Sequence, residues 1–229
     1  ALAAGLHVVS ANKGPVACAY HELRDLAARE GRRFRFEGAV MDGIPIFNLV
    51  RDTLPVVEVL GFRGVVNSTT NYTLCEMERG IPFAEALRDM QAQGIAEADA
   101  SLDVDGWDAA AKTAALVTVL MGGDLRPAGV RRTGIAALTP DDLRQAIARG
   151  QRLRLIASAT RHEDGTLTAH VGPELVPASD PLAQLAGMAN ALVLVTDLLG
   201  EVAIVQRDGG LTQTAYALLT DLLSLSPAR

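Results

Sequence analysis

The segment between Gly94 and Lys112 holds residue types suited to chemistry on a small, charged molecule. Its carboxylates, which precede the lysine, are Glu97, Asp99, Asp103, Asp105 and Asp108. The alanine-rich run that follows predicts a helix from Asp108 to about Met121, with Asp108 as its N-cap. Residues four apart share one helix face, so Lys112 would project from the same side as Asp108. A cation among anions at a loop-to-helix junction indicates a site for a small polar ligand.

Two other interpretations of this segment rest on the same residues. Acids favour the N-terminus of a helix, and Asp108 with Lys112 can form a surface pair worth about 0.2–0.5 kcal/mol. A calcium loop beginning at Ser101 would place Asp103 and Gly106 correctly, but its twelfth position, which needs a glutamate, is Lys112. The pattern excludes the calcium loop and leaves the surface pair and the ligand site open.

Lysine usage favours the ligand site. The chain has 21 lysine and arginine residues, and only Lys13 and Lys112 are lysines. A compact ammonium that can gain and lose a proton does chemistry that a guanidinium cannot do. We therefore expect a function for both lysines, with chance as the alternative.

Composition places the chain among soluble globular proteins. With 229 residues and 49% hydrophobic composition, it can bury a sizeable core. A net charge of −6 gives no support for nucleic acid or an anionic membrane as partner. No apolar run approaches the roughly 20 residues of a membrane span. Cys18 and Cys75 lack metal-ligand spacing, which favours a reduced, cytoplasmic setting.

The first 30 residues predict a strand, a turn and a helix. Residues 1–5 have the pattern of a final helical turn, so we expect the chain to begin within a fold. Residues 6–10 form an apolar run typical of a buried parallel strand, and a helix is expected over about 16–30. In sheets of this kind ligands bind beyond the carboxyl ends of the strands, where Lys13 would lie.

Residues 32–37 alternate like a strand, and residues 38–45 form a glycine-punctuated loop that leads into a helix ending near 52. Such a loop presents several backbone carbonyls at close range. With Glu37 beside it, the loop can be an oxygen-rich site for a monovalent cation or a plain tight turn.

Hydrophobic periodicity and turn residues predict the remaining elements. The polar run 67–71 opens a helix and can hold an anion or simply cap the helix. The other expected elements are a strand at 56–66, helices at 67–78, 81–94, 139–149 and 211–223, and antiparallel strand pairs at 153–161 with 166–176 and 189–196 with 201–206.

Five motifs, in chain order, resemble one known family. They are Val-Ser-Ala-Asn-Lys at 9–13, Gly-Ala-Val-Met-Asp-Gly-Ile-Pro-Ile at 38–46, Gly-Val-Val-Asn-Ser-Thr-Thr-Asn-Tyr at 64–72, the acidic segment with its lysine at 94–112, and Asp-Pro-Leu-Ala at 180–183. Together they resemble the homoserine dehydrogenases, and the similarity runs from about residue 5 to the end. Members of that family interconvert homoserine and aspartate semialdehyde with NAD or NADP, in threonine and methionine biosynthesis.

The resemblance implies roles for particular residues. It assigns Lys112 to proton transfer with the substrate oxygen, which suits general acid-base chemistry. The implied substrate-binding residues are Glu97, Asp103 and Asp108, and the implied cofactor-binding residues are Lys13, Gly94 and Gly210. A sodium ion would be held by Glu37 and the carbonyls of Val40, Asp42 and Ile44. The implied partners are a small-molecule substrate and a second copy of the chain, as a homodimer.

The implied fold class is α/β: an α+β substrate domain with a β-sheet and covering helices, plus a remnant of a Rossmann-like nucleotide-binding domain. We expect the remnant at 1–35, the substrate-binding and dimerisation domain at 36–199, and a segment returning to the nucleotide-binding domain at 200–229.

The chain also departs from the family pattern. The strand-GxGxxG-helix turn that binds the cofactor phosphates is not in this sequence, and about 100 residues of a domain are expected to be missing. Of the family's GPGAG before the last helix, only Gly209 and Gly210 remain. The departures keep two alternatives open: an inactive substrate-binding and dimerisation module, and a dehydrogenase for another small amino-acid-like alcohol.

Overall fold

A six-stranded sheet organises most of the molecule, and β3 lies near its middle. The computed structural model describes residues 1–92 and 99–225. The strands are β3 (Val59–Val65), β4 (Arg131–Arg132), β5 (Gln151–Arg161), β6 (Leu167–Pro177), β7 (Asn190–Thr196) and β8 (Gly200–Gln206), in the order β4-β6-β5-β3-β7-β8. All neighbours are antiparallel except the short β4–β6 pair. β3 therefore joins two hairpins that are each local in sequence.

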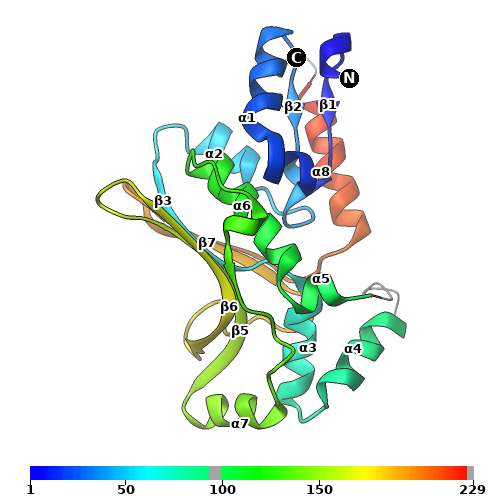
Figure 1. Cartoon of the computed structure of the whole chain (residues 1–229), viewed down its shortest axis with the longest axis vertical. Helices are drawn as coiled ribbons and strands as arrows, with labels where there is room; N and C mark the ends of the chain where they lie inside the picture. The colour runs from blue at the N-terminus through cyan, green and yellow to red at the C-terminus, as the bar shows by residue number, and fades with distance from the viewer. Residues whose placement is uncertain (93–98, 226–229) are drawn as a thin grey trace.

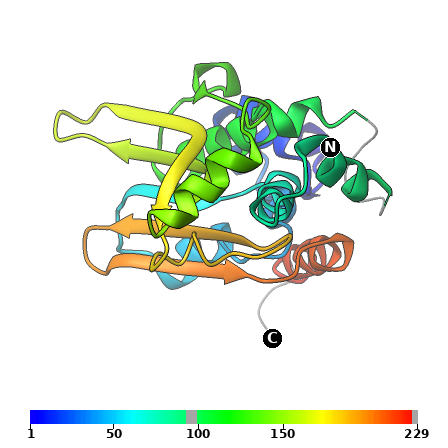
Figure 2. The same ribbon diagram turned by 90° about the horizontal axis from the view of Figure 1, so that it is seen from below.

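The two predicted antiparallel pairs are confirmed. β5 and β6 pair along their whole length, from Gln151 opposite Pro177 to Arg161 opposite Leu167. Their turn uses Gly165 in a left-handed conformation, with φ of 82°. The hairpin projects from the body of the molecule in Figure 2. β3 begins three residues later than predicted, because residues 54–57 form a turn and Val56 is exposed.

A second, two-stranded parallel sheet lies at the end of the molecule that holds both termini (Figure 1). β1 (Val8–Val9) and β2 (Phe34–Arg35) are joined by α1 (Lys13–Arg29), the crossover that a parallel pair requires. This strand-helix-strand unit was predicted, although β2 is shorter than expected. The strand stops because Phe36 leaves the extended region, with φ −157° and ψ 34°, and a 3₁₀ turn follows.

Most of the remaining helices lie close to predicted positions, but the short helices at 37–39, 101–104 and 127–129 were not predicted. The remaining helices are η1 (Leu2–Ala4), η2 (Glu37–Ala39), α2 (Phe47–Thr53), α3 (Ser68–Glu78), α4 (Phe83–Ala92), α5 (Ser101–Val104), α6 (Trp107–Leu120), η3 (Pro127–Gly129), α7 (Pro140–Ala148) and α8 (Leu211–Leu223). Caps explain where several begin: Asn67 accepts from the Thr70 amide at the start of α3, and Thr139 forms a capping box with Asp142 at the start of α7.

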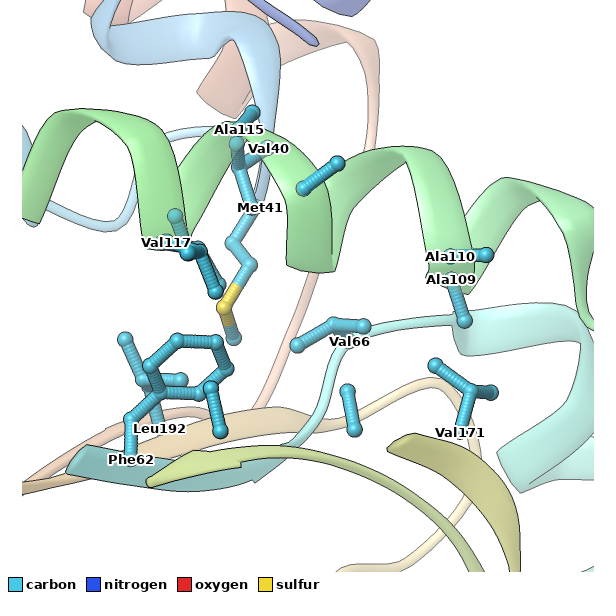
Figure 3. Close-up of a cluster of buried hydrophobic side chains, with 14 of the residues drawn as sticks. Val40, Met41, Phe62, Val66, Ala109, Ala110, Ala115, Val117, Val171 and Leu192 are labelled. Atoms are coloured by element: carbon cyan, nitrogen blue, oxygen red, sulfur yellow. The ribbon is translucent and has the colours of Figure 1, made fainter. Parts of the chain in front are cut away.

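The alanine-rich helix α6 lies against the sheet and buries one continuous core. Small side chains let the helix approach closely, and Val117 faces Phe62 and Leu192 of the sheet (Figure 3). Met41, from the loop after η2, fills the space between helix and sheet in the same view. Its unbranched side chain suits an irregular gap of this kind. The helix that carries Asp108 and Lys112 is thus fixed in place by packing along most of its length.

The six-stranded sheet includes β8, so position 200 falls inside the β7–β8 hairpin. After β8, the chain returns to η2 and β1 through α8, which packs against both. The domain limits remain a prediction. Within 1–92 and 99–225, no helix is both long enough and apolar enough to cross a lipid bilayer.

Candidate functional site

The first turn of α6 differs from the prediction. The helix begins at Trp107, and its N-cap is Gly106 in the left-handed conformation, with φ of 81°. The prediction that Asp108 is the N-cap is therefore wrong. A glycine adopts this conformation without the strain that a Cβ would cause, so the helix can begin two residues earlier than predicted. Asp108 is then inside the first turn, and its carboxylate is available to other side chains.

Both lysines of the chain bind Asp108. The Lys112 Nζ lies 3.0 Å from Asp108 Oδ2, and the Lys13 Nζ lies 2.9 Å from Asp108 Oδ1. The pair with Lys112 is the predicted same-face contact on α6. The pair with Lys13 joins residues 95 positions apart in the sequence. The convergence of the only two lysines on one carboxylate weighs against an ordinary surface pair.

Lys13 owes its position to the beginning of α1. Asn12 is the N-cap of this helix, and its side chain accepts a hydrogen bond from the Gly14 amide at 2.8 Å. Lys13 is thus the first helical residue, directly after the turn that follows β1. Its side chain remains 38% exposed, more than that of Lys112 at 18%. Lys13 is consequently the more accessible of the two ammonium groups.

Asn67 holds the two carboxylates of the site together. Its Nδ2 donates to Asp103 Oδ1 at 2.7 Å and to Asp108 Oδ2 at 2.8 Å. Its Oδ1 caps α3 through the Thr70 amide, so the side chain cannot rotate freely. The carbonyl of Val66, the preceding residue, accepts from Lys112 Nζ at 2.7 Å. The site residues predicted from the sequence did not include Asn67, although the polar run at 67–71 was the signal for it.

The two carboxylates have opposite electrostatic environments. Burial works to raise the pKa of Asp108, but the charges of Lys112 and Lys13, with the Asn67 amide, outweigh it and hold the pKa well below the usual range. Burial raises the pKa of Asp103, and the nearby Asp108 adds to this effect. Asp108 is therefore the member of the pair that stays ionised near neutral pH, and Asp103 is the one that accepts a proton more readily.

A cavity of about 610 Å³ opens beside these residues. Its lining consists of Lys13, Asp99, Leu102, Asp103, Trp107, Asp108, Ala111 and Pro127. Lys112 does not itself line the cavity, but it contacts Asp108, which does. Arg132 covers the Trp107 ring, with its Cζ 3.6 Å from the ring centroid. The cavity is lined by both charged and apolar side chains, as small-molecule sites are.

Glu37 lies away from this cavity and is engaged in another way. Its Oε1 accepts from the amides of Ile46 and Phe47, at 2.6 and 2.9 Å, and its Oε2 accepts from the Asn48 amide at 2.5 Å. Burial raises the pKa of Glu37 in spite of these three donors. The Ile44 carbonyl also accepts an amide, that of Ile46, at 3.0 Å.

Amide donors at the start of α2 thus satisfy the Glu37 carboxylate without a cation. In the part of the chain that the structure describes, no cluster of three or more His, Cys, Asp and Glu is arranged to hold a metal ion. The predicted sodium site of Glu37 with the carbonyls of Val40, Asp42 and Ile44 stays a prediction, and the donors seen here do not call for the ion.

Three further predicted residues are not part of the cavity as described. Glu97 and Gly94 lie outside the described residues. Gly210 is the N-cap of α8. A Cβ on the adjacent Gly209 would come within 2.5 Å of Asp42 Oδ2, so the two segments approach closely. The assignment of Gly210 to the cofactor remains a prediction.

The geometry defines what this site can do. An ammonium has three N–H donors, and Lys112 uses two of them on Val66 and Asp108. The third can donate to an oxygen of a bound molecule. Asp103 and Asp108 supply negative charge beside it, which suits a ligand that carries its own cation. The site is thus equipped to bind a small zwitterion and to exchange a proton with it.

Fold and site together define an α/β protein in which a parallel strand-helix-strand unit brings one lysine to a cavity carried by a mixed-sheet domain. The family model described as homoserine dehydrogenase matches residues 45–223. The chain belongs to the homoserine dehydrogenase family.

Individual relatives agree with this assignment. The chain is 40% identical over 225 residues to the NAD(+)-dependent homoserine dehydrogenase of Pseudomonas canavaninivorans, covering 98% of this chain and 64% of that protein. It is 41% identical over 220 residues to the homoserine dehydrogenase of Methanocaldococcus jannaschii, covering 96% and 64%. The chain therefore spans less than two thirds of the length of either relative.

Solved structures show the same fold. The crystal structure of a putative homoserine dehydrogenase from Archaeoglobus fulgidus superposes with a TM-score of 0.91 at 37% identity, over 97% of this chain and 68% of that one. The enzyme from Thiobacillus denitrificans gives a TM-score of 0.92 at 34% identity, over 98% and 52%. The α/β class predicted from the sequence is confirmed.

Proposed function

We propose that this chain is the substrate-binding portion of a homoserine dehydrogenase, which interconverts homoserine and aspartate semialdehyde with NAD or NADP. The observation that carries the proposal is the convergence of Lys13 and Lys112 on Asp108, at a cavity that Asp103 and Asp108 line. The substrate is a small amino acid whose ammonium matches the carboxylates and whose oxygen matches the lysine.

Lys112 exchanges the proton of the reaction. Reduction of the aldehyde requires an acid at its oxygen, and oxidation of the alcohol requires a base at the same position. The contacts with Val66 and Asp108 fix the Lys112 ammonium and leave one N–H for the substrate oxygen. The charged lysine is the form needed for reduction, because it can donate its proton to the aldehyde oxygen. Asp108 and Asp103, with Glu97 from the segment before them, bind the substrate ammonium.

The nicotinamide cofactor, when bound, accepts or supplies the hydride. In this chain Lys13 fits the cofactor side of the cavity, because its side chain is the more exposed of the two lysines and follows a strand end. Gly94 and Gly210 are proposed to approach the cofactor with their backbones. No step of the mechanism involves sodium. The free thiols of Cys18 and Cys75 agree with the proposed cytoplasmic setting.

Replacement of Lys112 tests the proposal. In a form that includes the whole nucleotide-binding domain, Lys112→Ala is expected to reduce homoserine turnover by about 10²- to 10⁴-fold. Arg79→Ala removes an exposed cation that pairs with Glu76 on α3, away from the cavity, and serves as the control. Turnover with NAD and with NADP is measured for each protein. Unchanged turnover in Lys112→Ala contradicts the role of Lys112.

A binding and dimerisation module without activity is the second candidate. It is favoured by the sequence, in which no GxGxxG turn accompanies the β1–α1–β2 unit. The two candidates differ in a direct measurement. Homoserine turnover by the 229-residue chain itself refutes the inactive module, whereas absence of turnover after a nucleotide-binding domain is supplied refutes the dehydrogenase.

A further inference from the structure

A second cavity, of about 390 Å³, lies at the free side of β2, between α1, α2 and the end of α6. It shares no lining residue with the cavity beside Asp108. In Figure 1, α1, β2 and α2 lie toward the end of the molecule that holds both termini, away from α3. Its volume falls in the range of sites for small molecules, about 300–1,000 Å³.

The rim of this second cavity concentrates positive charge. Glu37 is the one acid among its lining residues. Five arginines line the cavity: Arg24, Arg32, Arg33, Arg35 and Arg51. The Glu37 carboxylate is already satisfied by three amides of α2. In a chain with net charge −6, so many guanidinium groups around one cavity require an explanation.

The contacts of these arginines divide them into two groups. Arg24 and Arg51 each pair with the next residue, Asp25 at 2.8 Å and Asp52 at 2.6 Å. Arg33 and Arg35 donate to the carbonyl and the hydroxyl of Ser224, which are neutral acceptors. Within 1–92 and 99–225, no carboxylate pairs with Arg32, Arg33 or Arg35.

The repulsion between these like charges acts on Arg35 in particular. Partial burial and the like charges of Arg51 and Arg33 lower the pKa of Arg35, with Asp221 and Asp52 acting in the opposite direction. The guanidinium remains charged at any physiological pH. An anion placed between these groups would remove the repulsion and gain bidentate, charge-assisted hydrogen bonds.

The floor of the cavity is aromatic. Phe34 and Phe47 each pack against Phe36, with ring centroids 4.9 Å apart in both pairs. The Tyr20 ring lies 5.6 Å from Phe36, and the Arg24 guanidinium lies 5.8 Å from the Tyr20 centroid. A flat apolar body fits against such a surface, which a bare inorganic ion would leave uncovered.

We propose that this cavity binds a small organic anion, with a flat apolar or aromatic body on the phenylalanine floor and a carboxylate or phosphate head between Arg32, Arg33 and Arg35. This site is separate from the proposed reaction and does not depend on it.

Binding is tested on the 229-residue chain with four probes, by calorimetry and by amide NMR shifts. Benzoate and phenyl phosphate carry body and head together, and comparison of the two identifies the preferred head. Inorganic phosphate has the charge alone, and benzyl alcohol has the body alone. We expect saturable binding of benzoate, of phenyl phosphate or of both, with the shifts confined to β2, α2 and the middle of α1.

Single arginine variants locate the site. Arg35→Gln is expected to weaken binding of the preferred probe by roughly ten- to hundredfold, the effect of losing one charged hydrogen-bond partner. Arg32→Gln changes an exposed position and is also expected to weaken binding of the preferred probe. This variant tests the site even if the Arg35→Gln protein does not fold. Arg149→Gln, at the exposed end of α7, is the matched control and should bind as the parent does.

Several results would overturn the proposal. These are equal affinity for benzyl alcohol and benzoate, equal affinity for inorganic phosphate and phenyl phosphate, and unchanged binding in a folded Arg32→Gln variant. Shifts centred on Lys13 and Asp108 would place the probe in the other cavity and would equally refute it.

Discussion

At the scale of single residues, Asp108 determines the electrostatics of the candidate site. Its side chain is 13% exposed, and it binds two ammonium groups and one amide. A buried carboxylate is stable only when its charge is compensated in this way. The two lysines depend on Asp108 in turn, because Lys112 and Lys13 would lose their counter-charge if Asp108 were removed. Asp108 is therefore a structural residue as well as a proposed substrate ligand.

Asp108→Asn should lower the free energy of unfolding by about 2–4 kcal/mol near neutral pH. The native pKa of Asp108 lies below its unfolded value of about 3.9, so its ionised form stabilises the fold above about pH 4. That contribution declines as the pH falls further, and the difference between parent and variant should then shrink.

Urea unfolding at several pH values between about 3 and 7 measures this difference. Asp141→Asn is the control, since Asp141 forms an exposed pair with Arg144 on α7 and should change stability by less than about 0.5 kcal/mol. A parent-variant difference that stays constant down to pH 3 would contradict the assigned ionisation of Asp108.

At the scale of elements, the start of α3 is both a helix cap and a support for the site. Asn67 uses its oxygen for the Thr70 amide and its nitrogen for Asp103 and Asp108. The residue follows the end of β3 after a single residue, Val66, and β3 lies near the centre of the six-stranded sheet. The two carboxylates are thus positioned by the sheet through one side chain.

Three variants separate the two roles of Asn67. Asn67→Ala removes the cap and both carboxylate contacts, and should cost about 2–4 kcal/mol in stability. Thr139→Ala removes only the cap of α7, remote from the cavity, and should cost about 1 kcal/mol. Asn67→Asp keeps a capping oxygen but places a third carboxylate beside Asp103 and Asp108.

The Asn67→Asp variant should therefore gain stability relative to the parent as the pH falls from 7 to about 4, where the crowded carboxylates accept protons. Thermal unfolding of all four proteins at both pH values gives the comparison. Equal losses in Asn67→Ala and Thr139→Ala would mean that Asn67 is a cap and nothing more.

At the scale of the whole molecule, the six-stranded sheet ends in β8, whose outer edge pairs with no strand among the described residues. Val205 on this strand is exposed, as are Leu198 and Leu199 in the turn before it. Open edges with apolar residues favour pairing with another chain. We infer that the homodimer predicted from the family resemblance forms near this edge.

Sedimentation analysis should give twice the chain mass of 24.1 kDa. Val205→Glu should shift the protein toward the monomer, because a charge at the contact opposes burial. Val56→Glu changes a residue that is 79% exposed in the turn before β3 and should leave the mass unchanged. A monomeric parent would refute the dimer, and an unaffected Val205→Glu variant would refute this edge as its contact.

Sequence patterns predicted elements better than they predicted contacts. The helix at 211–223 has the bounds that periodicity gave, and both hairpins lie where turn residues placed them. The motifs identified the family and selected Lys13, Asp103, Asp108 and Lys112, which the fold brings together. Local pattern sufficed here because caps, turns and period act over a few residues.

The predictions failed where the structure depends on contacts between distant residues or on an unusual backbone conformation. The N-cap of α6 was misplaced because Gly106 adopts a left-handed conformation that a pattern of acids does not reveal. The link from Asn67 to Asp103 and Asp108 spans 36 and 41 residues, and only the fold creates it. The amides that surround Glu37 lie only 9 to 11 residues further along the chain, but the turn that brings them to its carboxylate does not follow from the sequence pattern.

Asp221 in α8 is fully buried, and it accepts hydrogen bonds from the Glu37 amide at 2.8 Å and from Asn48 Nδ2 at 3.1 Å. The last helix thus satisfies donors in η2 and α2, more than 170 residues earlier in the chain. Removal of α8 would take away both of these hydrogen-bond acceptors together with the helix packed on η2. For protein engineering, the helix must be kept through Asp221, and tags or fusions belong beyond it.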